Sequence, residues 1–287
     1  MSLSYRLLIN SMPKSGTHLL TQVVDLLGYR DFGAHETLWL RAKDRLGLGR
    51  PVVLAHLRVK RNCQRRIAVL GNRAGQTIPF DVTMPVQTPV ALAQRWLTSI
   101  PPGHYLSGHV PWTATTAELV REAGLKHLII IRDPRDVLVS FVHFVLRPEH
   151  ILSKDFASLS PDERVRLALE GGRGASSGVQ IAGLREGFAS IMAWQNEPSV
   201  LFVRFESLIG ERGDGSNAAQ QDAVRAICHH LDLASDDALV EQVCLRAFDT
   251  GAATFRRGKI GSWRDELTPD QIDWANQSFA SLLQDYA

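Results

Sequence analysis

The chain of 287 residues carries a formal net charge of +2, with 45% hydrophobic and 22% charged residues. This ordinary balance is typical of a globular protein with a sizeable core, and the small charge excludes nothing more than a strongly basic nucleic-acid-binding class. No apolar run approaches the length of a membrane span, and the first one begins too close to Met1 for a signal peptide. Three scattered cysteines lack zinc-site spacing, so we expect a cytoplasmic protein with reduced thiols and no metal.

The most informative segment joins the first predicted strand, at 5–9, to the first predicted helix. Apolar residues recur at helical spacing from Leu19 to Leu27, so residues 11–18 form a strand-to-helix loop. A helix N-terminus presents unpaired N–H groups and the positive end of the helix dipole, and Lys14 adds a mobile charge. The loop therefore indicates an anion-binding site, although a Lys-Ser-Gly turn also occurs as a plain connection.

The residue order of this loop differs from that of an ATP-binding P-loop. That motif needs a glycine ahead of a Gly-Lys pair, whereas here Lys14 precedes the loop's only glycine. The order Pro-Lys-Ser-Gly-Thr resembles the 5′-phosphosulfate-binding loop of sulfotransferases that use 3′-phosphoadenosine 5′-phosphosulfate (PAPS). The resemblance implies that Lys14 is catalytic. It also implies that the donor is bound by Pro13, Lys14, Ser15, Gly16, Thr17 and His18. No individual role is assigned to His18 within this set.

The stretch 45–100 is the most basic part of the chain. It contains many arginines and lysines but only one acidic residue, Asp81. The glycines Gly71 and Gly75 indicate a flexible insertion. One interpretation is an electropositive rim that holds an anionic donor or acceptor. The other is a solvated basic surface, which is the more usual role of such a run of charges.

A candidate general base follows the next strand-like segment, at 105–111. Histidine can remove a proton near neutral pH, but a lone histidine is more often structural, and ten are present. The resemblance singles out His109, because the family places its base in a His-x-Pro motif after a strand and between two phosphate-binding segments. We therefore predict that His109 is the general base. Many cytosolic members carry lysine two residues earlier, where this chain has Ser107.

The apolar run 127–131 predicts a buried parallel strand, and the Asp-Pro pair at 133–134 is typical of a helix start. Arg132 offers a planar fork to a phosphate and Ser140 a hydroxyl, unless Arg132 is paired with Asp136. The sequence Ile-Arg-Asp-Pro-Arg-Asp-Val-x-Val-Ser resembles the family's 3′-phosphate-binding segment. The resemblance implies that role for Arg132 and Ser140.

The rest of the chain alternates predicted helices with one more buried strand, at 200–205. Two capping boxes and three stretches with apolar spacing predict helices that begin at, or cover, 160–163, 268–271, 179–194, 218–231 and 236–248. The resemblance places Phe205 and Phe248 beside the adenine of the donor. Family members usually have tyrosine at the position of Phe205, and a phenylalanine such as Phe248 at a helix end is more often core.

The last motif lies in the segment 255–264, where charge alone indicates a basic surface loop. This segment resembles the family's Arg-Lys-Gly-x-x-Gly-x-Trp sequence, which closes over the 3′-phosphate. The resemblance implies that Arg256, Arg257 and Gly258 bind the donor. The family's C-terminal dimerisation segment is poorly matched, with only Thr268 identical, so the sequence leaves the oligomeric state open.

These patterns predict an α/β fold with a central parallel sheet flanked by helices, P-loop-like and nucleotide-binding, in one domain at 1–287. The resemblance predicts transfer of a sulfuryl group from PAPS to a hydroxyl of a phenol, alcohol, lipid or sugar, without metal or nucleic acid. Two alternatives remain. A P-loop-type nucleotide kinase would need Asp133 to bind magnesium, and a non-catalytic nucleotide- or polyanion-binding module is supported only by Ser107 and Phe205.

Overall fold

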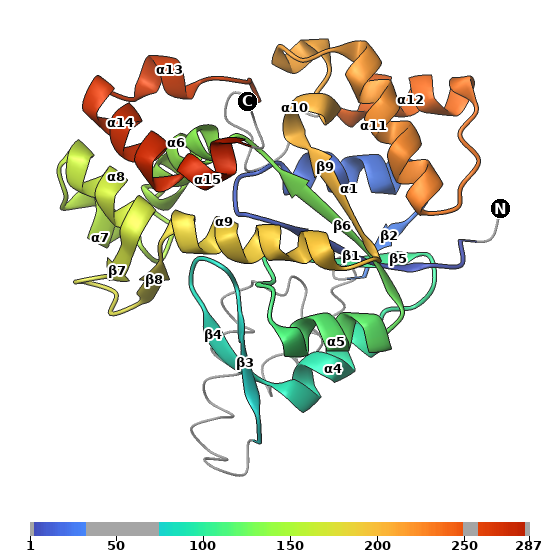
Figure 1. The fold of residues 1–287 in the computed structure, drawn as a ribbon, viewed down its shortest axis with the longest axis horizontal. Coiled ribbons are helices and arrows are strands. Elements are labelled where there is room, and N and C mark those ends of the chain that lie inside the picture. The colour runs from blue at the N-terminus through green and yellow to red at the C-terminus, as the bar shows by residue number, and fades with distance from the viewer. Residues whose placement is uncertain (1–2, 33–74, 249–257, 285–287) are drawn as a thin grey trace.

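The computed structural model describes residues 3–32, 75–248 and 258–284. At its centre lies a five-stranded sheet in the order β2–β5–β1–β6–β9, in which all neighbouring strands are parallel (Figure 1). Its strands are β1 (Arg6–Ser11), β2 (Arg30–Asp31), β5 (His104–Gly108), β6 (Leu125–Ile131) and β9 (Val200–Arg204). The predicted central parallel sheet and its three predicted apolar strands are confirmed.

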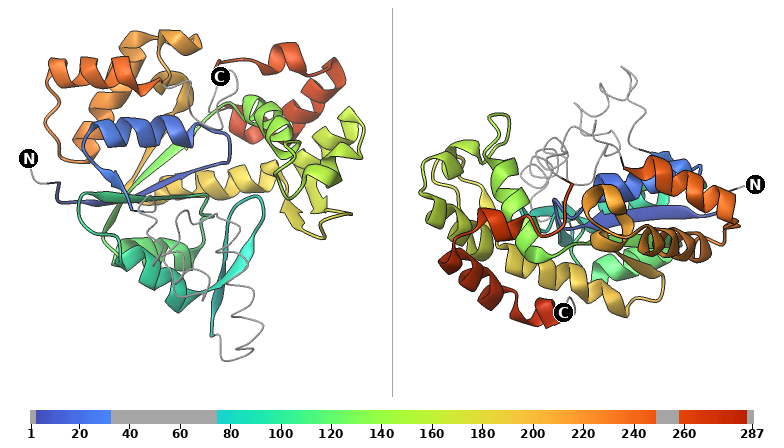
Figure 2. Two further views of the ribbon diagram at one scale, coloured as in Figure 1. Left: turned by 180° about the vertical axis from the view of Figure 1, so that it is seen from behind. Right: turned by 90° about the horizontal axis from the view of Figure 1, so that it is seen from above.

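Both faces of this sheet are covered by helices, because alternate residues of its central strands point to opposite sides. Leu7 and Ile9 pack into one core cluster, whereas Leu8 packs into the other. The first cluster includes residues of α1 (Thr17–Leu26), α10 (Phe205–Leu208), α11 (Asn217–His230) and α12 (Asp237–Ala247). The second includes residues of α4 (Val90–Thr98), α5 (Ala114–Glu122), α6 (Pro134–Val145), α7 (Ser153–Ala157), α8 (Pro161–Glu170) and α9 (Leu184–Met192) (Figure 2). A sheet buried on both faces explains the continuous apolar runs of β1 and β6.

The rest of the described chain comprises two antiparallel hairpins, two 3₁₀ helices and the C-terminal helices. The hairpins pair β3 (Thr77–Phe80) with β4 (Val86–Pro89) and β7 (Gly171–Arg173) with β8 (Gln180–Ala182). The helices are η2 (Ala193–Asn196), η3 (Glu211–Gly213), α13 (Trp263–Glu266), α14 (Pro269–Ser278) and α15 (Ala280–Leu283). The helix predicted at 179–194 is wrong at its start, because residues 180–182 pair with β7 and the helix begins at Leu184. Residues 75–98 of the predicted basic insertion form β3, β4 and α4, and 45–74 lie outside the described residues.

The predicted helix starts at the capping motifs are confirmed. Ser160 and Thr268 each form a reciprocal capping box, with proline at the first helical position of α8 and of α14. The carboxylate of Asp133 accepts a hydrogen bond from the backbone N–H of Arg135 at 2.9 Å, at the start of α6. These local contacts satisfy N–H groups that have no partner within the helix, so the sequence alone determines where these three helices begin.

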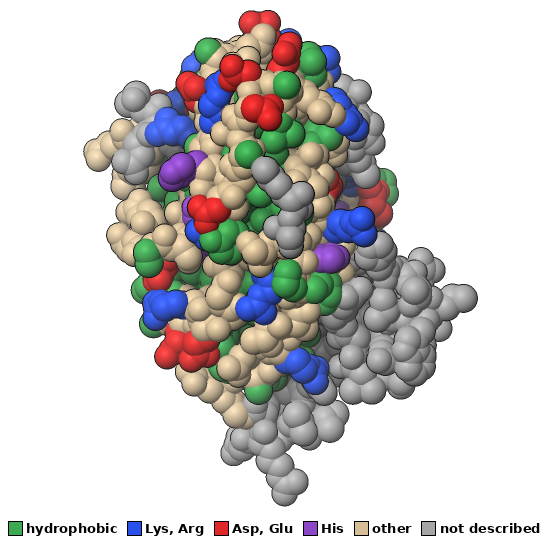
Figure 3. All heavy atoms as spheres, turned by 90° about the vertical axis from the view of Figure 1, so that its right-hand side faces the viewer, with side chains coloured by type: hydrophobic (Ala, Val, Ile, Leu, Met, Phe, Trp, Pro, Cys, Tyr) green, Lys and Arg blue, Asp and Glu red, His purple; other side chains and the backbone are tan. Residues whose placement is uncertain are grey.

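The described surface carries interspersed charges. Figure 3 shows Lys and Arg side chains separated by acidic and hydrophobic ones on the face turned to the viewer. Within the described ranges, no helix is long and apolar enough to cross a membrane. In the same ranges, no three His, Cys, Asp or Glu side chains are grouped in a way that could hold a metal ion.

A buried histidine in β6 gives the fold a specific acid sensitivity. His127 is fully buried, its ring packs edge-to-face on Trp194 at 4.6 Å, and neither ring nitrogen has a hydrogen-bond partner among the described residues. Burial, with a smaller contribution from His230, lowers the pKa of His127 to about 3. The unfolded chain binds this proton below about pH 6.5, so the free energy of unfolding should fall with pH below that value, by about 1.4 kcal/mol per pH unit.

We therefore expect a His127→Phe variant to lose about 2 kcal/mol less free energy of unfolding than the wild type between pH 7 and pH 5. Phenylalanine keeps a ring against Trp194 and has no group to protonate. Urea unfolding at the two pH values measures the difference. The control is His229→Gln, which changes an exposed histidine of α11 and should show the acid dependence of the wild type. Equal acid sensitivity of His127→Phe and the wild type would contradict the expectation.

Candidate active site

Four predicted site segments follow four neighbouring strands of the sheet. His109 follows β5, the loop with Lys14 follows β1, Arg132 follows β6 and Phe205 follows β9. Because these strands are adjacent and parallel, their carboxyl ends lie at one edge of the sheet, where α/β proteins bind ligands. The structure therefore brings together segments that are far apart in the sequence.

The Lys14 loop, residues 11–18, turns sharply between β1 and α1. Lys14 and Gly16 have φ angles of 74° and 101°, both in the left-handed region. A β-carbon built on Gly16 would lie 2.6 Å from Cδ2 of Phe205, too close for any side chain. Glycine is therefore required at this position by the backbone conformation and by the close packing of Phe205.

Ser15 is the residue of this loop that most directly fits an anion. Its side chain is fully buried, and its hydroxyl has no hydrogen-bond partner among the described residues. It lies just before α1, whose N-terminus has no side-chain cap. A buried hydroxyl without a partner is costly, and the cost is relieved when an anion oxygen accepts its hydrogen bond. The loop therefore fits a phosphate-bearing ligand.

The charge of Lys14 lies beside α6. Its Nζ atom is 4.7 Å from the centroid of the Phe144 ring, a favourable contact between a cation and an aromatic face. Phe144 and Ser140 belong to the same helix, so the contact links the loop after β1 to the helix after β6. The Lys14 loop is thus in contact with the helix that carries the predicted 3′-phosphate ligand Ser140.

His109 is attached to the Lys14 loop through Ser11. Its Nδ1 lies 2.8 Å from the backbone carbonyl oxygen of Ser11 and 3.3 Å from the hydroxyl of that residue. A carbonyl oxygen can only accept, so Nδ1 carries the proton and Nε2 is the basic nitrogen of the neutral ring. The Ser11 hydroxyl is also 2.6 Å from that of Thr17, at the first residue of α1. His109 is therefore hydrogen-bonded to the loop that carries Lys14.

Arg132 is buried and its guanidinium is held by protein groups. Nη2 donates to the carbonyl oxygen of Lys259 at 2.7 Å and lies 3.5 Å from a carboxylate oxygen of Asp136. The guanidinium also lies over the Phe205 ring, 4.4 Å from its centroid. The pairing with Asp136, which the sequence left as the alternative, is therefore present. Phosphate binding by Arg132 stays a prediction, with a side chain that is already oriented.

Asp136 anchors the C-terminal motif to α6, a role that the sequence reasoning missed. Its carboxylate oxygens accept hydrogen bonds from the backbone N–H groups of Gly261 and Trp263, at 2.8 Å and 3.1 Å, and the residue is buried. The guanidinium of Arg135 lies 3.9 Å from the centroid of the Trp263 ring. The position of Asp136 in the Arg-Asp-Pro-Arg-Asp sequence could have indicated this role. The sequence reasoning treated Asp136 only as an ion-pair partner of Arg132.

The other predicted donor-binding residues differ in burial, and two of them lie outside the described residues. Ser140 is buried in α6. Phe248 is partly buried at the end of α12 and packs against the core, so its contact with adenine stays a prediction. Gly258 has a φ angle of 61° and begins the last described segment, whereas Arg256 and Arg257 lie outside the described residues.

His18 and Pro13 lie at opposite extremes of exposure within the Lys14 loop. Pro13 is buried, whereas His18 is exposed. Desolvation by neighbouring atoms, followed by the positive charge of Lys14, lowers the pKa of His18. Both effects favour the neutral form of the imidazole.

Asp133, the acid that the kinase alternative requires, is engaged in local structure. Besides capping α6, its carboxylate forms an ion pair with Arg135 at 2.7 Å. Its backbone N–H donates to the carboxylate of Glu206 at 2.8 Å, and burial raises the pKa of Glu206. These contacts join the segments after β6 and β9, and they favour a structural role for Asp133 over a magnesium-binding one.

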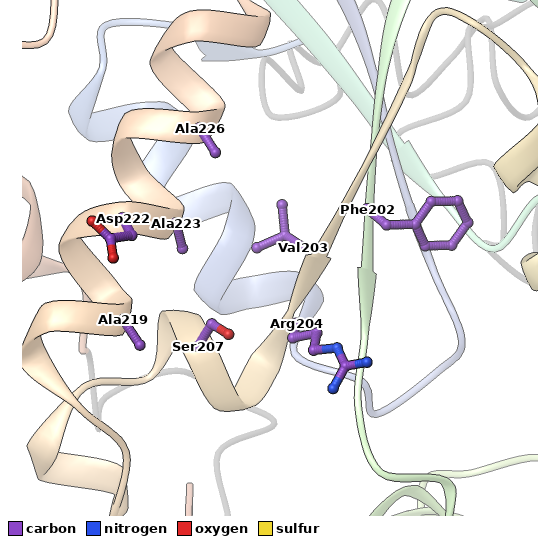
Figure 4. A pocket seen from close by; sticks show the side chains of 8 residues that line it. All are labelled: Phe202, Val203, Arg204, Ser207, Ala219, Asp222, Ala223 and Ala226. Atoms are coloured by element: carbon purple, nitrogen blue, oxygen red, sulfur yellow. The ribbon is translucent and has the colours of Figure 1, made fainter. Parts of the chain in front are cut away.

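A hollow of about 400 Å³ lies between β9, α10 and α11 (Figure 4). Its lining consists of Phe202, Val203, Arg204, Ser207, Ala219, Asp222, Ala223 and Ala226. None of these is a predicted site residue.

Comparisons with solved structures and with a curated relative agree with this architecture. Mouse sulfotransferase SULT7A1 complexed with PAP is 17% identical, with a TM-score of 0.57 over 97% of this chain and 84% of that chain. Retinol dehydratase in complex with androsterone and the inactive cofactor PAP is 14% identical, with a TM-score of 0.55 over 98% and 81%. Cytosolic sulfotransferase 13 of Arabidopsis thaliana is 24% identical over 183 residues, which are 58% of this chain and 55% of that protein. The match thus spans about half the length of the curated relative, and the structures confirm the predicted fold class.

The family assignment comes from a model of whole domains. The sulfotransferase domain model matches residues 5–287, which is nearly the entire chain. The matched stretch contains the Lys14 loop, His109, Arg132 and the C-terminal motif. The family predicted by resemblance is confirmed, and the chain belongs to the sulfotransferase domain family.

Proposed function

We propose that this chain is an enzyme that transfers the sulfuryl group of PAPS to a hydroxyl of a small-molecule acceptor. The observation that carries the proposal is the attachment of His109 to the Lys14 loop at the 2.8 Å contact between Nδ1 and the Ser11 carbonyl oxygen. It aligns a base with an anion-binding loop at one edge of the sheet. PAP, the desulfated donor, is bound by two relatives with this fold, which supports PAPS as the donor.

The donor would be held by groups on three neighbouring strand ends. The Lys14 loop would hold the 5′-phosphosulfate with its N–H groups and the unpartnered Ser15 hydroxyl. Arg132 and Ser140 would hold the 3′-phosphate together with Arg256, Arg257 and Gly258, and Phe205 and Phe248 would lie near the adenine. When bound, the donor supplies an electrophilic sulfur on a phosphate leaving group. The match to residues 5–287 supports one domain at 1–287, and the cytosolic name of the Arabidopsis relative supports a cytoplasmic location.

The protein's part of the reaction is proton removal and charge stabilisation. Nε2 of His109 accepts the proton of the acceptor hydroxyl as its oxygen forms a bond to sulfur. The bond between sulfur and the bridging phosphate oxygen breaks, and its electron pair stays on the departing phosphate. Lys14 stabilises the negative charge that grows there, as cationic side chains do in the related phosphoryl transfers. Interactions that strengthen with this charge accelerate the reaction.

Incubation of the protein with sulfur-labelled PAPS and separate phenol, lipid-alcohol and sugar acceptors tests the proposal. We expect label in at least one acceptor class and release of PAP in equal amount. Parallel reactions with ATP labelled at the γ-phosphate should transfer nothing. Tight PAP binding without transfer to any acceptor would favour the non-catalytic module. ATP-dependent phosphorylation would favour the kinase.

A further inference from the structure

Asn10 is a fully buried polar residue at the end of β1, just before the Lys14 loop. Its side-chain oxygen accepts hydrogen bonds from the backbone N–H groups of Val110 at 2.7 Å and Ser11 at 2.9 Å. Its side-chain nitrogen donates to the carbonyl oxygen of Val110 at 2.9 Å. One amide therefore binds both backbone polar groups of the residue that follows His109.

The backbone around His109 is held from three directions. The carbonyl oxygen of His109 accepts a hydrogen bond from the N–H of Val82, in the turn between β3 and β4, at 3.0 Å. The indole of Trp194, in η2, donates to the carbonyl oxygen of Val110 at 3.1 Å. The pairing of β5 with β1 ends at Gly108, and the side-chain contacts of Asn10 extend the link to β1 past His109 to Val110.

The same amide also binds the backbone of Ser11, the residue whose carbonyl oxygen orients the His109 ring. Asn10 binds the N–H of Ser11, and the carbonyl oxygen of Ser11 receives the Nδ1 proton of His109. The ring of His109 and the backbone that follows it are thus both hydrogen-bonded to the end of β1. The arrangement fixes the direction of Nε2 relative to Lys14, and small errors in such a direction are costly for proton transfer.

We propose that Asn10 is a positioning residue that aligns His109 with the Lys14 loop. The inference rests on the proposed function, in which His109 is the general base. A buried amide in an otherwise apolar strand costs desolvation free energy, which its three hydrogen bonds offset. The hydrogen bonds of Asn10 go to the backbone of two loops at the candidate site, at Ser11 and Val110. An amide that only stabilised the fold would not need to join these two loops.

A double-mutant cycle between Asn10→Ala and His109→Ala tests the inference. Asn10→Ala alone is expected to lower kcat by about 10- to 100-fold, because the base is misaligned. The Kd for PAP should change by less than about threefold, since the donor-binding groups remain. In the His109→Ala background, Asn10→Ala should change the residual rate by less than about threefold, because residues that act as a unit are not additive.

The outcomes separate this inference from the proposed function. If His109→Ala is slow and Asn10→Ala lowers the rate by the same factor in both backgrounds, Asn10 does not act through His109 and the inference is overturned alone. If His109→Ala retains near wild-type activity, the proposed base is wrong and the inference falls with it. A loss of PAP affinity as large as the loss of kcat would also overturn a positioning role.

Two further variants keep the test decisive if Asn10→Ala folds poorly. Asn10→Asp keeps the oxygen that accepts from Val110 and Ser11 but loses the donor to the Val110 carbonyl, so an intermediate kcat and the same lack of additivity are expected. Gln220→Ala is the matched control. This buried amide donates to the carbonyl oxygen of Leu208 at 2.9 Å, so its loss should lower the Tm while kcat stays within about twofold.

Discussion

Replacement of His109 by alanine is expected to lower kcat by about 100-fold or more, within the usual range for a general acid or base. The reason is the fixed tautomer: Nδ1 donates to the Ser11 carbonyl oxygen, which leaves Nε2 as the proton acceptor. Initial rates at saturating PAPS and acceptor measure kcat. Titration calorimetry with PAP should give a Kd within about threefold of the wild type, because the imidazole is not required to hold the nucleotide.

His104 provides a matched control for this substitution. It lies at the first residue of β5, at the end of the strand opposite to His109, and its Nδ1 is 3.0 Å from the carbonyl oxygen of Pro102. His104→Ala should keep kcat within about twofold of the wild type. A near wild-type rate for His109→Ala would remove His109 from the catalytic role. Equal losses in both variants would indicate a general effect on the strand.

Replacement of Lys14 by methionine should lower kcat by about 100- to 1,000-fold, the usual effect of removing one group that stabilises transition-state charge. Methionine keeps the length and the contact with the Phe144 ring but removes the ammonium group. The growing negative charge on the leaving phosphate is then poorly balanced. Because this charge is larger in the transition state than in the bound donor, kcat should fall more than PAP affinity. Rates at saturating substrate and PAP calorimetry measure the two effects.

Two lysine variants complete this test. Lys14→Arg keeps the charge in a wider, planar group and should recover part of the rate. Lys126→Met changes another lysine that lies over an aromatic ring, with Nζ 4.8 Å from the centroid of Tyr5. It is located at the start of β6, away from the site, and should leave kcat within about twofold. A rise in the KM for PAPS with unchanged kcat in Lys14→Met would show that Lys14 only holds the donor.

Local signals predicted much of the fold correctly. The apolar runs at 5–9, 127–131 and 200–205 became β1, β6 and β9, because strands covered by helices on both faces need apolar residues throughout. The capping boxes at Ser160 and Thr268 marked the starts of α8 and α14. The helix predicted at 179–194 was wrong at its start, since the pairing of β8 with β7 overrides the helical spacing there. Whether a segment pairs with another strand depends on both segments, so it cannot be read from the apolar spacing of one segment alone.

The sequence predicted the separate motifs of the candidate site. It did not predict the contacts that join one motif to another. Nothing in the Arg-Asp-Pro-Arg-Asp sequence shows that Asp136 binds the backbone N–H groups of Gly261 and Trp263. Likewise, Asn10 lies just after the predicted strand at 5–9 and drew no prediction, although it binds Val110, which is 100 residues away in the sequence. Such contacts depend on which strands become neighbours, and the spacing of residues along the chain does not encode that order.

The sequence by itself determined the buried strands, the residue types of the motifs and the helix starts at capping motifs. It also determined the glycine of the Lys14 loop, the His-x-Pro segment and the family. These are local properties, set by backbone conformation, capping and the period of apolar residues. Only the tertiary structure decided that β5, β1 and β6 are neighbours, that Ser11 receives the Nδ1 proton of His109, and that Arg132 is already paired with Asp136. Those facts follow from burying both faces of one sheet, which places distant strand ends side by side.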